Sequence, residues 1–173
     1  GPNTGAPLTS HPGVDHISFT GSSEVGRVIA EAGGRNLVPV TCELGGKTPN
    51  VVFADADLDQ AVSMAISSIC MNQGQICMST ERIIVVDAVA DKFIARFKEK
   101  AATLAVGDPR DGKAPLGAVV DRKSVDHVQS LIADATGAGA VQVNGGDADG
   151  VLMPAHVIDK VAMVFGQMNE SPG

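Results

Sequence analysis

Apolar and polar residues alternate along the chain in a pattern that predicts short buried strands separated by helices. Residues 15–20 are expected to form a strand, and Ser22 can cap the helix that follows it. Gly33 and Gly34 are expected to end this helix, and residues 37–44 then return to an apolar strand pattern. A strand, a short turn, a helix and a second strand form a βαβ unit, which predicts a parallel sheet.

The same alternation continues along the rest of the chain. Residues 50–53 are expected to form a strand, Asp57 to open an amphipathic helix, and residues 82–86 to form another strand. Further on, the pattern predicts helices at 90–104 and 124–135, a loop at 107–115, and short strands at 141–143, 155–158 and 162–165. The sequence therefore predicts the α/β class.

Composition and charge narrow the classes of partner. The chain has 173 residues and a formal net charge of −7, and its only aromatic residues are five Phe. An acidic chain with few aromatic side chains predicts no binding to nucleic acid or to an anionic membrane surface. No apolar run is long enough for a membrane span. Three Cys without framework spacing fit reduced thiols and predict a cytoplasmic location. The Cys and His spacings match no metal-binding motif, so no metal site is predicted.

The turn at Gly21 and Ser22 is one candidate binding site. It lies where a predicted strand turns into a helix, and the unpaired N–H groups of a helix N-terminus suit a phosphate. A glycine there allows a ligand to approach the backbone. The alternative is an ordinary capped helix, and the spacing alone leaves both interpretations open.

Glu43 and Cys77 are the candidates for chemistry. Glu43 ends an apolar strand, where open α/β sheets place ligands, and a carboxylate there can act as a general base. Cys77 follows a polar stretch that contains Gly74, so its thiol can be reachable. The alternatives are a surface acid, a helix cap or a partner for Lys47 in the case of Glu43, and a small buried apolar residue in the case of Cys77.

Three motifs, taken together, resemble those of the aldehyde dehydrogenase superfamily over essentially the whole chain. They are FTGSSEVG at 19–26, ELGGKTPNVVFADADLDQAV at 43–62 and NQGQICMSTERIIV at 72–85. The separation of 34 positions between Glu43 and Cys77 also resembles that family. The stretch around Cys77 is most similar to bacterial aromatic aldehyde dehydrogenases of the salicylaldehyde and vanillin type.

The resemblance implies an activity and a role for each matching residue. The activity is the NAD- or NADP-dependent oxidation of an aldehyde to the carboxylic acid. The similarity of the stretch around Cys77 to aromatic aldehyde dehydrogenases implies an aromatic aldehyde. Cys77 matches the nucleophile that forms a thiohemiacetal and then a thioester, and Glu43 matches the base that activates water. The residues that match cofactor-binding positions are Gly21, Ser22, Val25, Leu44, Gly45 and Glu170. The family pattern around Glu170 contains a Phe that this chain lacks.

The resemblance also implies an organisation. Residues 1–44 match the last part of a Rossmann-like cofactor domain, and residues 45–173 match much of an α/β catalytic domain, in proteins about three times as long that form dimers or tetramers. The isolated chain is therefore expected to turn over weakly or not at all, and to expose apolar surface at Val40 and at 51–53. Two other classes stay open: a truncated, non-catalytic binding or structural relative, and a cofactor-independent thiol esterase.

Overall fold

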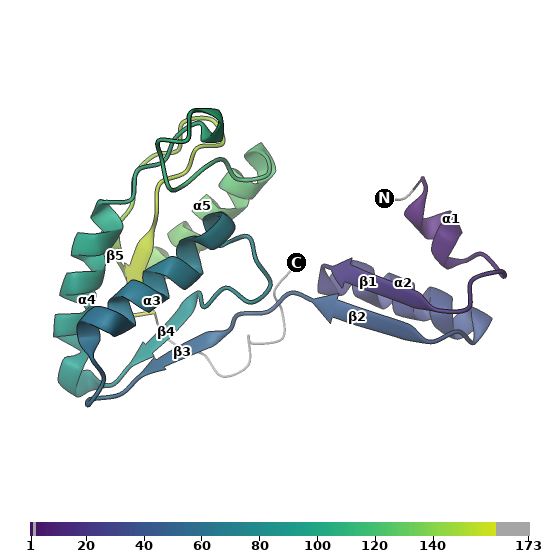
Figure 1. Ribbon diagram of the computed structural model, residues 1–173, viewed down its shortest axis with the longest axis horizontal. Helices are drawn as coiled ribbons and strands as arrows, with labels where there is room; N and C mark the ends of the chain where they lie inside the picture. The colour runs from purple at the N-terminus through teal and green to yellow at the C-terminus, as the bar shows by residue number, and fades with distance from the viewer. Residues whose placement is uncertain (2, 162–173) are drawn as a thin grey trace. The chain divides into compact units, whose positions relative to one another are not determined.

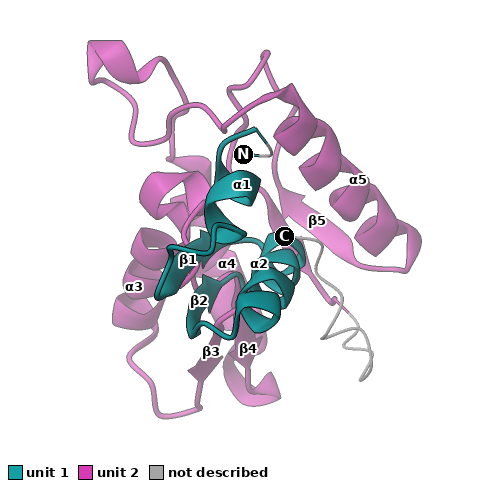
Figure 2. Cartoon of the chain, turned by 90° about the vertical axis from the view of Figure 1, so that its right-hand side faces the viewer, with its two compact units in different colours: residues 1–46, 165–173 teal, residues 47–164 magenta. Residues whose placement is uncertain are grey.

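A computed structural model describes residue 1 and residues 3–161 of the chain, and these fall into two compact units (Figure 1). The first unit begins at Gly1 and runs to Gly46, and the second begins at Lys47 (Figure 2). Each unit contains its own parallel pair of strands with a connecting helix. The predicted α/β class is therefore observed in both units.

The first unit is built on the predicted βαβ arrangement. Strand β1, Ile17–Gly21, and strand β2, Val40–Leu44, pair in parallel, and helix α2, Ser23–Asn36, connects them. A short helix α1, Gly5–Thr9, precedes them. The strands are in register from their first residues to their last, so that Gly21 lies opposite Leu44. Both strands therefore end at the same edge of the sheet.

Helix α2 does not end at Gly33 and Gly34, as the sequence predicts, but continues to Asn36. A Cβ atom on Gly33 would lie 2.2 Å from Cγ2 of Val40, so this glycine serves close packing of the helix on β2. The helix ends instead at Leu37, whose φ of 54° is left-handed and whose N–H bonds back to the last turn. Because Leu37 caps the helix, β2 starts at Val40 and not at the predicted residue 37.

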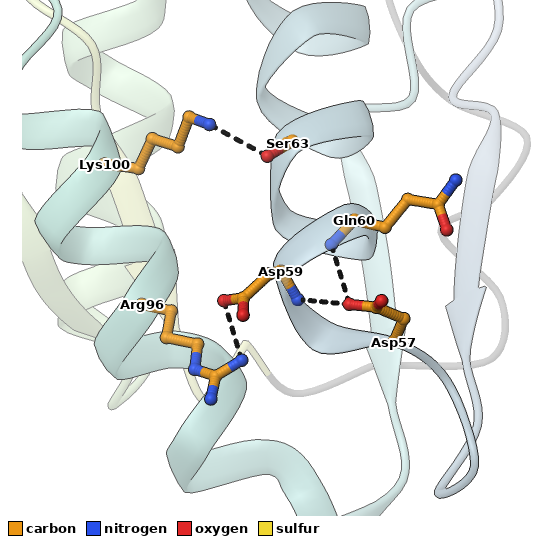
Figure 3. A network of polar contacts seen from close by, with 6 residues as sticks. All are labelled: Asp57, Asp59, Gln60, Ser63, Arg96 and Lys100. Carbon is orange, nitrogen blue, oxygen red and sulfur yellow. Dashed lines mark hydrogen bonds and ion pairs between the residues drawn. The ribbon is translucent and has the colours of Figure 1, made fainter.

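The second unit repeats the strand–helix–strand arrangement. Strand β3, Pro49–Val52, pairs in parallel with strand β4, Arg82–Val85, and helix α3, Leu58–Cys70, lies between them in the chain. Asp57 caps α3 as predicted, because its carboxylate accepts the backbone N–H groups of Asp59 and Gln60 (Figure 3). The structure thus confirms the predicted start of this helix.

The core of the second unit lies between the sheet and helices α3 and α4. Helix α4, Asp87–Ala102, buries Phe93 and Phe97, whose rings stack with centroids 5.7 Å apart. These rings meet Val52 of β3 and the buried face of α3. The helix ends two residues before the predicted end at Leu104, and Leu104 still packs against the same core from the segment that follows.

The remaining elements complete the second unit. They are the short helical turns η1, Met71–Gly74, and η2, Pro109–Asp111, helix α5, Arg122–Gly137, and the antiparallel strands β5, Val141–Asn144, and β6, Val157–Asp159. The strand predicted at 162–165 lies outside the described residues. No helix in the described part of the chain is both long and apolar enough to cross a membrane.

One face of the β3–β4 sheet and the residue that follows β3 carry exposed apolar side chains. Val51 is 50% exposed and Phe53 is 63% exposed, as expected from the sequence. The expectation was wrong for Val52, which is buried in the core, and for Val40, which is half-buried against Gly33 in the first unit. Successive residues of a strand point to opposite faces, so the run 51–53 cannot be exposed as a whole.

Candidate active site

The parallel register of the first unit brings several predicted site residues to one edge of its sheet. Gly21 and Leu44 lie opposite each other at the carboxyl ends of β1 and β2, and Glu43 lies opposite Thr20. Ser22 and Gly45 are the residues that follow the two strands. Ligands of open α/β sheets bind at this edge, because the loops and helix N-termini that leave the strands are gathered there.

The N-terminus of α2 opens at this edge. The Ser22 hydroxyl accepts a hydrogen bond from the backbone N–H of Val25 at 3.2 Å, which leaves the hydroxyl proton free to donate. The first turn of a helix presents unpaired N–H groups and the positive end of the helix dipole. Val25, on this first turn, is 46% exposed. The donors and the exposed apolar side chain suit a ligand with a phosphate and an apolar ring.

Glu43 lies on the face of β2 that points away from α2. The half-buried side chains of β2 alternate with exposed ones, and Leu44 reaches Gly26 of the helix, so Glu43 belongs to the other, exposed face. Its carboxylate makes no hydrogen bond or ion pair with another described residue of the first unit. Lys47, one alternative partner, instead forms an ion pair with Glu81. The interpretation of Glu43 as the partner of Lys47 stays a prediction, because the two residues belong to different units.

Cys77 lies at the corner of a tight turn in the second unit. The N–H of Ser79 bonds to the carbonyl of Ile76 at 3.0 Å, which closes the turn, and the side chain of Cys77 is exposed. The competing interpretation, a buried apolar Cys77, is therefore wrong for this chain. A thiol in this position can be reached by a small electrophile.

The segment before Cys77 has a left-handed backbone. Asn72, Gln73 and Gly74 have φ values of 50°, 56° and 76°. Such conformations are costly for Gln and persist where the surroundings hold them. Here the Asn72 side chain donates to the carbonyl of Gln75, and the Gln75 side chain in turn accepts the N–H of Val120 at 3.0 Å. These bonds anchor the segment that leads into the turn of Cys77.

A groove of about 410 Å³ runs beside this turn, between it and one face of α3. The residues on both sides of Cys77 contribute to its wall, and both are apolar: Ile76 and Met78. The opposite wall comes from the end of α3 and the residue after it, through Ser63, Met64, Ser67, Ser68 and Met71. Ser79 completes the lining. A groove of this volume suits a small organic ligand.

The other two thiols differ from Cys77. Cys42 and Cys70 are half-buried, in agreement with their interpretation as residues inside apolar patterns. Burial raises the pKa of the Cys70 thiol above its ordinary value, so that less of it is ionised at neutral pH. Cys77 is therefore the most accessible of the three thiols. The described residues contain no cluster of three or more side chains suited to hold a metal ion.

Comparison with known proteins identifies the family of the chain. The model of the Aldehyde dehydrogenase family matches residues 1–169. The chain belongs to the aldehyde dehydrogenase family. It is 48% identical over 154 residues to a vanillin dehydrogenase of Pseudomonas sp. (strain HR199 / DSM 7063), covering 89% of this chain and 32% of that protein.

Other similar proteins show the same partial coverage. A salicylaldehyde dehydrogenase of Pseudomonas putida is 44% identical over 155 residues, covering 89% of this chain and 32% of that protein. The crystal structure of an E. coli NADP dependent enzyme superposes with a TM-score of 0.88 and 39% identity, covering 91% of this chain and 34% of that one. The chain thus spans about a third of the length of the relatives that it matches.

Membership of the aldehyde dehydrogenase family confirms the resemblance read from the three motifs. The structure divides the residues predicted from those motifs into two groups. Six of them belong to the first unit, namely Gly21, Ser22, Val25, Glu43, Leu44 and Gly45, and Cys77 belongs to the second. Glu170 lies outside the described residues. The roles assigned to all of these residues stay predictions.

Sequence reasoning missed two features of the site. One is the pair of α3 serines, Ser63 and Ser67, that line the groove. Their i, i+4 spacing places them on one side of the helix, but a spacing alone does not indicate that this side lines a groove. The ion pair between Lys47 and Glu81 had no sequence signal, because its partners lie on segments that only the β3–β4 pairing brings together.

Proposed function

We propose that the full-length protein carrying this chain oxidises an aldehyde to the carboxylic acid with a nicotinamide cofactor, using Cys77 as nucleophile and Glu43 as general base. The observation that carries the proposal is the exposed thiol of Cys77 at the corner of a turn whose neighbouring residues line a groove. Membership of the aldehyde dehydrogenase family supports the same chemistry.

Cys77 provides the covalent step. Its thiolate forms a sulfur–carbon bond with the carbonyl carbon of the aldehyde, which gives a thiohemiacetal. Loss of hydride from that carbon leaves a thioester on Cys77. The backbone N–H of Cys77 is a candidate donor to the oxyanion, because an N–H beside the nucleophile lies close to the developing charge.

Glu43 serves the second step. A carboxylate that takes a proton from water allows the oxygen to attack the thioester carbon, the sulfur–carbon bond breaks, and the acid is released with the thiolate restored. A base in this role must not be held in a permanent ion pair. The exposed carboxylate of Glu43 has no such partner among the described residues of the first unit, and Lys47 is paired with Glu81 within the second.

The carboxyl edge of the first unit fits the cofactor. Ser22 and the first turn of α2 would hold the pyrophosphate through hydroxyl and backbone N–H donors, and Val25 would pack on the adenine. Gly45 is exposed and has open space where a Cβ atom would lie, which allows a flat ring to approach the backbone next to Leu44. The nicotinamide, when bound, supplies the hydride acceptor; both NAD and NADP suit these residues.

The groove favours an aromatic aldehyde. Three of its lining residues are methionines, Met64, Met71 and Met78, and thioether groups make favourable contacts with aromatic rings. The names of the vanillin and salicylaldehyde dehydrogenases, two of the relatives, point the same way. Formation of a homodimer or homotetramer by the full-length protein stays a prediction, as does a cytoplasmic location.

The proposal is tested with the full-length protein, two variants and one control variant. Cys77→Ala is expected to abolish aldehyde-dependent reduction of the cofactor, whereas the control Cys70→Ala is expected to retain it. Glu43→Gln is expected to give one equivalent of reduced cofactor per site and then stop, because the thioester forms but is not hydrolysed. Steady turnover by Cys77→Ala would refute the proposal. Ester hydrolysis that needs Cys77 but no nucleotide would favour the thiol esterase instead.

A further inference from the structure

An ion pair joins the two segments that lead into the β3–β4 sheet. Lys47 lies shortly before β3 and Glu81 directly before β4, and the parallel register begins next to them, with Pro49 opposite Arg82. Glu81 also follows Cys77 by four positions in the chain. Glu81 therefore connects the turn of the candidate nucleophile to the sheet, and Lys47 fixes this connection to the neighbouring strand.

The carboxylate of this ion pair is partly shielded from water. The Glu81 side chain is 29% exposed, whereas the acid side chains of four other ion pairs of the described residues are 41–83% exposed. Charges that are partly removed from water attract each other more strongly and are screened less by salt. The pair of Lys47 and Glu81 is therefore better suited than these other pairs to hold two segments together.

Backbone hydrogen bonds connect Glu81 to the turn of Cys77. The N–H of Glu81 bonds to the carbonyl of Ser79 at 3.0 Å, and the N–H of Ser79 bonds to the carbonyl of Ile76, also at 3.0 Å. Each of these bonds spans only two or three positions, so no flexible linker separates Glu81 from the turn. A displacement of Glu81 is therefore transmitted to the turn and is not absorbed along the chain.

A second side-chain contact attaches the same segment to α3. The hydroxyl of Thr80, the residue before Glu81, donates to the hydroxyl of Ser68 at 2.8 Å. The segment that follows Cys77 is thus attached to α3 by one residue and to the chain before β3 by the next. A single point of attachment leaves a segment free to rotate about it. Because the ion pair supplies a second point on another element, it restricts this rotation.

We propose that Lys47 and Glu81 are positioning residues for the oxidation of the aldehyde, because their ion pair holds the turn of Cys77 in the orientation from which the thiolate attacks. This inference rests on the proposed function, since it concerns the nucleophile named there. Small displacements of a reacting group cost large factors in rate, because attack requires a narrow range of distance and angle. Both residues act through the turn and not on the substrate.

The first test follows the first turnover of the full-length enzyme with benzaldehyde and saturating cofactor, by rapid mixing. Glu81→Gln and Lys47→Met each remove one charge of the pair, and each is expected to lower the first-turnover rate constant about tenfold or more. The half-saturating benzaldehyde concentration should change by less than about threefold, because the groove stays intact. The double variant should be no slower than either single variant, because both lose the same contact. Lys47→Arg, which keeps the charge, should retain most of the rate.

The matched control is Asp59→Asn, which breaks the ion pair between Asp59 on α3 and Arg96 on α4 (Figure 3). This pair also joins distant segments of the second unit, with 37 positions between its partners against 34 for Lys47 and Glu81, but it does not attach the turn of Cys77. The control is expected to keep the wild-type rate. An undiminished rate in Glu81→Gln, an equal loss in Asp59→Asn, or losses that multiply in the double variant would overturn the inference.

A second test needs no turnover. Amide hydrogen exchange of residues 76–81 is compared in the full-length wild type, Lys47→Met and Asp59→Asn, which all have the same sequence in this segment. Exchange is expected to be about threefold to fivefold faster in Lys47→Met alone, because the segment opens more often without the ion pair. Unchanged exchange in Lys47→Met would overturn the inference. Faster exchange in a protein that oxidises no aldehyde would overturn the proposed function but retain the ion pair as the anchor of the turn.

Discussion

The hydroxyl of Ser79 provides a sharp test of how the wall beside Cys77 is built. Ser79 is only 3% exposed, and its Oγ has no hydrogen-bond partner within the described part of the chain. Both of its backbone groups are bonded, the N–H to Ile76 and the carbonyl to the N–H of Glu81. The substitution Ser79→Ala therefore removes an unpaired buried hydroxyl and nothing else.

The expected effect is a gain in stability. A buried polar group without a partner costs about 1–3 kcal/mol, because it loses its bonds to water and gains none in exchange. Removal of the group should raise the free energy of unfolding by a similar amount. For a small protein with a urea dependence of about 1–3 kcal/mol per molar, the unfolding midpoint should rise by about 1 M.

The neighbouring Ser68→Ala is the matched comparison, with the opposite expected sign. It removes the acceptor of the Thr80 hydroxyl, a bond of 2.8 Å, and should lower the free energy of unfolding by about 1 kcal/mol. The chain contains no Trp or Tyr, so unfolding is followed by far-ultraviolet circular dichroism in urea. A loss of stability in Ser79→Ala would refute the reasoning and indicate that a buried water pairs with this hydroxyl.

Three further predictions concern the thiols, a helix cap and the core. Iodoacetamide should label Cys77 before Cys42 and Cys70, as measured by peptide mass spectrometry, and equal labelling rates of the three thiols would contradict this order. Labelling of Cys70 should accelerate only at a pH above the ordinary thiol range, because burial raises the pKa of this thiol. Asp57→Ala should lower the free energy of unfolding by about 1 kcal/mol and speed amide hydrogen exchange in the first turn of α3. Unchanged exchange rates would show that the Asp57 cap does not stabilise this turn. Phe97→Ala should cost about 3–5 kcal/mol by calorimetry, and a cost below about 1 kcal/mol would mean that this core is not closely packed.

Local signals predicted the elements well. Ser22 and Asp57 were expected to cap helices, and both do, because capping involves only residues two or three positions apart. The expectation failed at Gly33, where a glycine that resembled a helix end instead makes room for Val40. The two roles of glycine, freedom of φ and absence of a Cβ atom, are indistinguishable until the packing partner is known.

The sequence by itself determined the α/β class, the parallel pairing of the first unit, the family, and the choice of Glu43 and Cys77 as candidates, since these follow from periodicity and from motifs of fixed spacing. Only the tertiary structure decided that Cys77 is exposed on a turn, that the serines of α3 line a groove beside it, and that Lys47 pairs with Glu81. The physical reason is that exposure and pairing depend on which distant segments meet. A local pattern specifies which face of an element is apolar, but not what covers it.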